Sequence, residues 1–181
     1  MADSSGLRKE ATTAAAAVEP GSAVTEAAFK AACGRYATGV SIVTGLGPDG
    51  RKEGLTVNSF TSLSLDPPLV LFCLDKQAGS FEAFAAVERF AVNVLSEDQA
   101  DVSTHFAKPG VRDKFAGVAH DVDADGLPML SAALARIACD VEARHEGGDH
   151  IILVGRVRRI DLGDEAGRPL VYFRGRYGKF I

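Results

Sequence analysis

The stretch ARIACDVEARHEGGDHIILVGRVRRI, residues 135–160, decides the fold. Its first half alternates between apolar and polar side chains with a period of two, which predicts a strand with one buried face. The apolar set is Ala135, Ile137, Cys139, Val141 and Ala143. EGGD, residues 146–149, predicts a tight reversal, and HIILVGRVRRI, residues 150–160, predicts a longer returning strand. The stretch is therefore expected to form an antiparallel β-hairpin.

Apolar runs bounded by turn residues predict further strands on both sides of this hairpin. They cover residues 40–44, the approach to residues 54–68, and residues 69–74, 90–95 and 169–173. The run 69–74 is continuously apolar, which predicts a buried strand. Asp66-Pro67-Pro68 is expected to stop regular pairing just before it.

Short helices are predicted between these strands. Thr25 is a good N-cap for a helix over residues 26–36. Ser80 begins a second helix, and Ser96 with Gln99 forms a capping-box pattern for a third. Six or more strands, mostly in hairpin order with short helices between them, predict a mainly β fold built as a small antiparallel barrel.

Composition limits the class of protein. The chain has 181 residues, 46% of them apolar, which is typical of one globular domain. Lys and Arg number 20 against 24 Asp and Glu, a net charge of −4 that argues against binding duplex nucleic acid. No run approaches the length of a membrane span. Residues 1–24 lack the apolar core of a signal peptide and are expected to be a loosely ordered tail before a domain at 25–181.

The cysteines point to a reducing compartment. Cys33, Cys73 and Cys139 are far apart in sequence, odd in number and set among apolar residues. They are interpreted as buried, reduced thiols of a cytoplasmic protein.

Three short patterns look like known sites and are set aside. Gly45, Gly47 and Gly50 match G-x-G-x-x-G, but a strand and not a helix follows, so a hairpin turn is expected. The aspartates at 121–125 begin a calcium-loop pattern that lacks its final Glu. HEGGDH, residues 145–150, is one residue too long for H-E-x-x-H and contains helix-breaking glycines, so no metal site is expected.

The sequence also offers no paired catalytic carboxylates and no nucleophile beside a base. Hydride transfer through a flavin needs neither, because the cofactor carries the chemistry and the protein supplies shape and hydrogen bonds. GLTVNSFTSLSLDPP, residues 54–68, provides hydroxyls, an amide and apolar side chains of the kind that a flavin requires. DKQAGS, residues 75–80, adds a lysine and a serine at a helix start.

The order of several segments resembles one family. ATGVSIVTG (37–45), the run from Gly54 to Ser80, FAVNVLSEDQADVSTHFA (90–107), RDKFAG (112–117), GLPML (126–130), GDHIILVGRV (148–157) and PLVYFRGRYGKF (169–180) resemble the flavin reductase components of two-component flavin-dependent monooxygenases. The resemblance covers residues 29–180. It implies an FMN-binding split barrel, usually a homodimer, that uses NADH or NADPH to reduce FMN or FAD for a separate oxygenase.

The resemblance also implies roles for individual residues. Contacts with the isoalloxazine and ribityl groups fall to Thr56, Val57, Asn58 and Ser59. The ribityl-phosphate end falls to Ser62, Ser64, Lys76 and Ser80. The segment that closes over the flavin carries Phe106, Lys108 and Lys114. His150 lies near the nicotinamide, and Tyr177 is a C-terminal aromatic of the site.

Structural interpretations of the same residues stay open. The hydroxyls of 54–68 can satisfy edge-strand backbone, Asp149-His150 can be a turn and a strand start, and each lysine can be solvated. Tyr177 can simply pack the last strand. An alternative function is an electron carrier that retains its FMN. A third candidate, an oxidase of the pyridoxamine phosphate type, is disfavoured because that class oxidises its own substrate in a more basic pocket.

Overall fold

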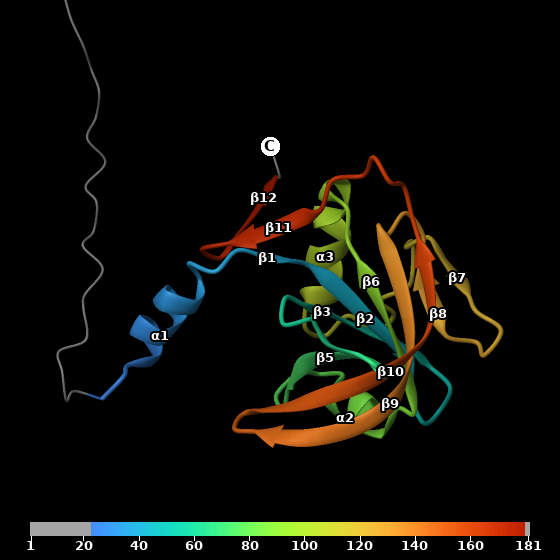
Figure 1. The fold of residues 1–181 in the computed structure, drawn as a ribbon, viewed down its shortest axis with the longest axis horizontal. Helices are drawn as coiled ribbons and strands as arrows, with labels where there is room; N and C mark the ends of the chain where they lie inside the picture. The colour runs from blue at the N-terminus through green and yellow to red at the C-terminus, as the bar shows by residue number, and fades with distance from the viewer. Residues whose placement is uncertain (1–22, 180–181) are drawn as a thin grey trace, which may run out of the picture.

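A computed structural model describes residues 23–179 (Figure 1). The expected tail at 1–24 lies almost entirely outside the described residues. The helices are α1 (Glu26–Cys33), α2 (Phe81–Ala86), the 3₁₀ helix η1 (Glu97–Gln99) and α3 (Ala100–Ala107). The strands are β1 (Thr38–Gly39), β2 (Ser41–Leu46), β3 (Lys52–Val57), β4 (Thr61–Leu65), β5 (Pro68–Asp75), β6 (Arg89–Val94), β7 (His120–Val122), β8 (Pro128–Leu130), β9 (Ala135–Gly147), β10 (His150–Leu162), β11 (Leu170–Phe173) and β12 (Arg176–Lys179).

The main sheet has seven strands in the order β3-β2-β6-β9-β10-β5-β4, all paired in the antiparallel sense. The predicted hairpin at 135–160 is confirmed as β9 and β10, the two longest strands, and they lie near the middle of the sheet. Their pairing begins at His150 opposite Gly147 and runs to Leu162 opposite Ala135.

The two edge strands of this sheet are consecutive along the chain. β3 and β4 are joined only by Asn58–Phe60, a link that spans at most about 14 Å. The sheet must therefore curl until its first and last strands are near each other. They do not pair, so the barrel is open at one seam. This arrangement confirms the expected mainly β split barrel with a few short helices.

The barrel interior is filled by aromatic and aliphatic side chains. Phe72 of β5 packs edge-on against Phe84 of α2 and Phe90 of β6, with ring centroids 6.4 and 5.2 Å apart. These rings are fully buried, as is Leu153 of β10. The core therefore joins opposite walls of the barrel, and it fixes the curl that the short β3–β4 link requires.

A second core cluster lies between the barrel and α3. Phe106 of α3 packs over β3, where Gly54 leaves space for its ring: a Cβ at Gly54 would lie 2.4 Å from the Phe106 Cε1 atom. Phe115 adds an edge-on contact with Phe106 at 5.2 Å. The absence of a side chain at Gly54 thus allows α3 to lie directly on the edge strand β3.

The remaining elements lie outside the barrel. β1, β11 and β12 form a small sheet, and β7 pairs with β8. Helix α1 has no buried residue and projects away from the barrel beside that small sheet (Figure 1). In the described part of the chain, no helix has the length and apolar character needed to cross a bilayer.

Local signals at helix starts are confirmed. Thr25 caps α1 by accepting the Ala28 N–H at 3.2 Å, although the helix ends at Cys33 and not at residue 36. The capping box of Ser96 and Gln99 is present. Both signals depend on residues three positions apart, which is why the sequence alone reveals them.

Two strand predictions were wrong in detail. Asp66 and Pro67 form a tight turn, and pairing resumes at once with Pro68 opposite Leu65. β5 alternates between buried and more exposed residues and is not buried throughout. Its second face, with Leu69, Leu71 and Cys73, is only partly covered.

The alternation expected in β9 is interrupted where both faces are covered. Cys139 packs in the barrel core, and its neighbour Ala138 packs outward against Leu127 and Met129. Burial raises the pKa of the Cys139 thiol to about 12, so this thiol stays protonated. The expectation of three buried thiols was wrong: Cys33 is exposed and Cys73 is half-buried.

Candidate functional site

A cleft of about 930 Å³ opens at the seam of the barrel. Its walls come from the end of β3 with the adjoining link, the end of β5 with the loop 77–80, and the end of α3 with the loop 107–114. His150, the first residue of β10, also lines it. Segments that are far apart in sequence therefore meet in one concave site of a size that suits a cofactor.

Most of the site residues predicted from the sequence line this cleft. They are Thr56, Val57, Asn58, Ser59, Ser80, Phe106, Lys108, Lys114 and His150. Four others do not line it in this chain: Ser62, Ser64, Lys76 and Tyr177. The structure thus brings together the TVNS wall (residues 56–59), the start of α2, the end of α3 with the loop after it, and the tip of the β9–β10 hairpin.

Ser59 connects the β3–β4 link to β5. Pairing between β4 and β5 starts with Thr61 opposite Leu71, and Ser59 lies two residues before it, facing Cys73. Its hydroxyl accepts the Cys73 N–H at 3.0 Å and donates to the Cys73 carbonyl at 3.3 Å. One side chain therefore satisfies the two backbone groups of β5 at the point where the ladder ends.

Thr56 also has a structural partner. Its hydroxyl donates to the Ser103 carbonyl of α3 at 2.6 Å, and Val57 beside it is buried in the barrel core. Asn58, by contrast, is exposed within the cleft. β3 is an edge strand, so alternate backbone groups along it are not used in the sheet. The wall at residues 56–58 therefore presents main-chain groups and one amide to the cleft.

Lys114 is held against the same wall. Its ammonium donates to the Phe106 carbonyl at 2.8 Å and to the Gly54 carbonyl at 3.1 Å. Burial lowers the pKa of this amine, and the nearby Glu53 carboxylate partly opposes that effect. An ammonium has three N–H donors, so one remains for a group in the cleft.

The rim of the cleft carries residues that the sequence did not single out. Arg112 is exposed on the loop after α3, and Asp75, Gln77 and Cys73 come from β5 and the loop behind it. No local pattern marks these residues, since they become neighbours only when β5 meets the end of α3.

Lys76 binds the hairpin tip instead of the cleft. Its ammonium contacts the Glu146 carboxylate at 2.6 Å and donates to the Gly148 carbonyl at 2.7 Å. Tyr177 shares a hydrogen bond of 2.8 Å with the Ser103 hydroxyl on α3. Ser62 and Ser64 lie on β4, beyond the link.

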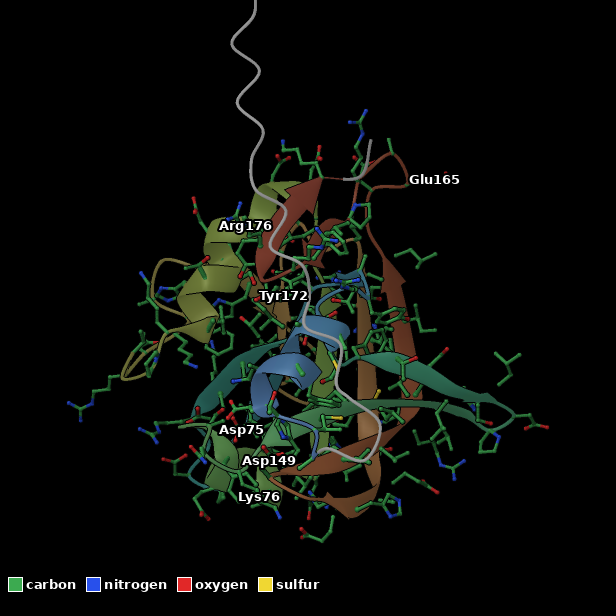
Figure 2. The ribbon with its side chains drawn as sticks, turned by 90° about the vertical axis from the view of Figure 1, so that its left-hand side faces the viewer. Asp75, Lys76, Asp149, Glu165, Tyr172 and Arg176 are labelled. Atoms are coloured by element: carbon green, nitrogen blue, oxygen red, sulfur yellow. The ribbon has the colours of Figure 1, made fainter. Side chains whose placement is uncertain are left out.

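His150 lies where the hairpin tip meets the end of β5. It pairs with Gly147 on one side and with Asp75 on the other. Its Nδ1 lies 2.8 Å from the Asp149 Oδ1 atom. Figure 2 shows Asp75 and Asp149 together at this end of the barrel. The imidazole is thus carried by a paired strand and not by a flexible loop.

The three patterns set aside earlier are structural. The glycine pattern is the β2–β3 turn, where the Gly50 N–H donates to the Gly47 carbonyl and Gly50 has a φ of 76°. The Asp123 carboxylate accepts backbone N–H groups of its own loop. Within residues 23–179, no group of three or more potential ligands could hold a metal ion.

Two other histidines, His105 and His120, have local partners. A nitrogen of His105 lies 3.1 Å from the Lys114 carbonyl, and Nδ1 of His120 lies 2.7 Å from the Val118 carbonyl. Both therefore contact main-chain carbonyls in the structure around α3 and β7.

Comparison with known proteins assigns this architecture to a family. Residues 33–180 match the flavin reductase like domain. The chain belongs to this family. The match includes all of the cleft and leaves out the segment before Cys33.

Individual relatives agree with this assignment. A Rhizobium meliloti (strain 1021) protein named "Probable flavin reductase" is 45% identical over 83% of this chain and 47% of its own length. The reductase subunit HsaB of a flavin-dependent monooxygenase from Mycobacterium tuberculosis (strain CDC 1551 / Oshkosh) is 40% identical over 82% of this chain and 79% of its own. The chain thus spans about half of the first relative and most of the second.

A solved structure gives the same result. The NADH:FAD oxidoreductase SgcE6 of Streptomyces globisporus C-1027, in complex with NAD and FAD fragments, superposes with a TM-score of 0.80 and 35% identity. The alignment covers 86% of this chain and 92% of that one. The similarity therefore extends over the barrel and its cleft.

The role of Ser59 as a connector can be tested by stability. Ser59→Ala leaves the part-buried N–H and carbonyl of Cys73 without their hydrogen-bond partner. We therefore expect the free energy of unfolding to fall by about 1–2 kcal/mol. Ser62→Ala, which removes an exposed hydroxyl of β4, is the matched control and should change it by less than about 0.5 kcal/mol. Urea unfolding measures both. Equal stability of the two variants would show that Ser59 does not hold the link to β5.

Proposed function

We propose that the protein is an NAD(P)H:flavin oxidoreductase that binds FMN or FAD in the seam cleft and reduces it by hydride transfer from a nicotinamide nucleotide. The observation that carries the proposal is the convergence of the TVNS wall, the loop 77–80, Lys114 and His150 on one cleft, in a chain of the flavin reductase family.

The residues present fit a flavin. Main-chain groups and the Asn58 amide at the end of β3 suit the polar edge of an isoalloxazine ring, and the half-buried Ala78 and Val111 supply apolar surface. The remaining N–H of Lys114 suits an anionic phosphate. When bound, the flavin supplies the redox chemistry, and the chain binds and orients the reactants.

The relatives favour a particular donor and a particular receiver. SgcE6 is named as an NADH:FAD oxidoreductase and HsaB as a monooxygenase reductase subunit. By analogy, we propose NADH as the hydride donor and a separate oxygenase as the partner that receives reduced flavin. The alternative, an electron carrier that retains FMN, is disfavoured by these relatives, and it predicts a protein that stays yellow through gel filtration.

The first prediction concerns the reaction itself. The purified chain should oxidise NADH in the presence of FMN or FAD, and His150→Ala should lower kcat/KM for NADH about tenfold, because a nucleotide held out of line reacts slowly even when bound. Flavin affinity should change less. Stopped-flow reduction of the flavin-loaded protein across NADH concentrations measures both.

A protein that binds flavin and never accepts hydride from NADH or NADPH would refute the proposed function. Reduction by His150→Ala at wild-type rates would refute only the role of the histidine.

The second prediction concerns the phosphate. Lys114→Ala should raise the Kd for FMN about tenfold and leave that for riboflavin within about twofold, because riboflavin lacks the phosphate that the ammonium would contact. Lys76→Ala should change neither value, since its ammonium is engaged at the hairpin tip. Fluorescence titration gives the four constants. A selective loss of FMN binding in Lys76→Ala would show that Lys76, and not Lys114, contacts the phosphate.

The pH dependence of FMN binding has a defined sign. Burial lowers the pKa of Lys114 in the folded protein, and a bound phosphate raises it again. The preference for FMN over riboflavin should therefore be greatest below the pKa of Lys114 in the flavin-free protein. It should fall as pH rises above that value and be lost once pH passes the pKa of Lys114 in the complex. In Lys114→Ala this pH dependence should disappear.

The third prediction concerns assembly. Leu65 and Leu63 on the edge strand β4 are exposed, as are Ile160 and Leu162 at the end of β10. We propose that a homodimer covers such apolar surface. Light scattering should give about twice the 19.0 kDa of the chain. A fully active monomer at micromolar concentration would refute the dimer.

A further inference from the structure

Lys76, the residue that follows β5, holds the backbone of the β9–β10 turn. The Lys76 N–H donates to the Asp149 carbonyl at 3.0 Å, and its ammonium donates to the Gly148 carbonyl at 2.7 Å. The same ammonium pairs with Glu146 at 2.6 Å. Figure 2 shows Lys76 beside Asp149 at the end of the hairpin. The turn that carries His150 is therefore fixed from outside the hairpin.

On this turn the side chains of Asp149 and His150 contact each other. Oδ1 of Asp149 lies 2.8 Å from Nδ1 of His150. The hydrogen bond with His150 is the largest cause that lowers the pKa of Asp149, and the charge of Lys76 acts in the same direction. The carboxyl group is therefore ionised at neutral pH and can only accept a hydrogen bond.

The proton of the neutral imidazole is placed by this contact. Since the Asp149 carboxylate only accepts, Nδ1 of His150 must carry the hydrogen. Nε2 then holds a lone pair and is an acceptor. His150 lines the cleft, so the remaining nitrogen is available to a ligand there. A ligand that uses it must bring a donor.

We propose that Asp149 is a positioning residue that holds His150 in the Nδ1–H tautomer, so that Nε2 accepts a hydrogen bond from the carboxamide of the nicotinamide. This inference rests on the proposed function, which assigns His150 to the nicotinamide nucleotide. The carboxamide NH₂ is the hydrogen-bond donor on the nicotinamide ring, and it matches a nitrogen that can only accept. The role requires no proton transfer by His150, in keeping with hydride chemistry.

The expected effect is moderate. The Asp149 side chain is 83% exposed and that of His150 is 39% exposed, and a contact between exposed groups changes an equilibrium by a factor of about five at most. We therefore expect Asp149→Ala to lower kcat/KM for NADH about three- to fivefold. Asp149→Asn keeps an acceptor oxygen for the Nδ1 hydrogen and should restore most of the loss.

The first test uses the ligand-free protein. ¹⁵N NMR of the imidazole, recorded as the pH is raised until the ring is neutral, should show a protonated Nδ1 and an unprotonated Nε2 at His150. Asp149→Ala should shift the ring toward the other tautomer, and Asp149→Asn should not. Glu146→Gln removes a carboxylate from the same hairpin and should leave the spectrum unchanged. A wild-type ring protonated mainly at Nε2 would overturn the inference.

The second test removes the donor from the nucleotide. The reduced 3-acetylpyridine analogue of NADH carries a methyl ketone in place of the carboxamide and so has no NH₂. Asp149→Ala should lower kcat/KM with NADH and change it by less than about twofold with the analogue. An equal loss with both nucleotides would overturn the proposed contact.

The two tests separate this inference from the proposed function. If the wild-type protein shows the Nδ1–H tautomer and reduces no flavin with any nucleotide, the proposed function is wrong and with it the assignment to nicotinamide. If the wild-type protein reduces flavin and Asp149→Ala matches it in both the spectrum and the kinetics, only the role of Asp149 is wrong.

Discussion

The short link Asn58–Phe60 is the constraint on which the rest of the structure depends. It joins the two edge strands of a seven-stranded sheet, and a link of this length forces the sheet to curl into a barrel. The link holds the two edge strands near each other, but they do not pair, so the barrel stays open between them. Beyond the end of the β4–β5 ladder, the Ser59 hydroxyl forms hydrogen bonds with both backbone groups of Cys73. The cleft is the open seam that this arrangement leaves.

Other elements gather at the seam because of packing that lies elsewhere. Gly54 lets the Phe106 ring approach β3, and this contact brings α3 and the loop after it to the cleft. The long β9–β10 hairpin extends past the barrel core, so its tip reaches the end of β5. Lys76 fixes that tip. The positions of Lys114 and His150 thus follow from core contacts and strand length, not from the cleft itself.

Sequence patterns predicted the parts of this structure that depend on near neighbours. The β9–β10 hairpin, the Thr25 cap and the Ser96–Gln99 capping box each follow from residues a few positions apart. Most of the site residues that the resemblance to a family implied line the cleft. Lys76 was assigned to the flavin phosphate because a lysine before a helix start suits an anion, yet Gly148, which lies 72 positions away, holds its ammonium. Such long-range competition for a side chain cannot be seen in a local pattern. A local pattern also cannot show that Asp75 and Arg112 meet on the rim of the cleft, because they come from segments far apart in sequence.

The hydroxyls of residues 54–68 show why structural and functional interpretations need not exclude each other. Thr56 and Ser59 use their hydroxyl hydrogens within the protein, which supports the interpretation that they satisfy backbone at a sheet edge. They thereby hold the end of β3 and the link after it in place, and main-chain groups of residues 56–58 form the wall of the cleft. An edge strand exposes unpaired groups along its whole length, but a flavin ring needs them in one place and beside an apolar surface. The polar residues of this segment therefore shape the site even where their own hydrogen bonds stay inside the protein.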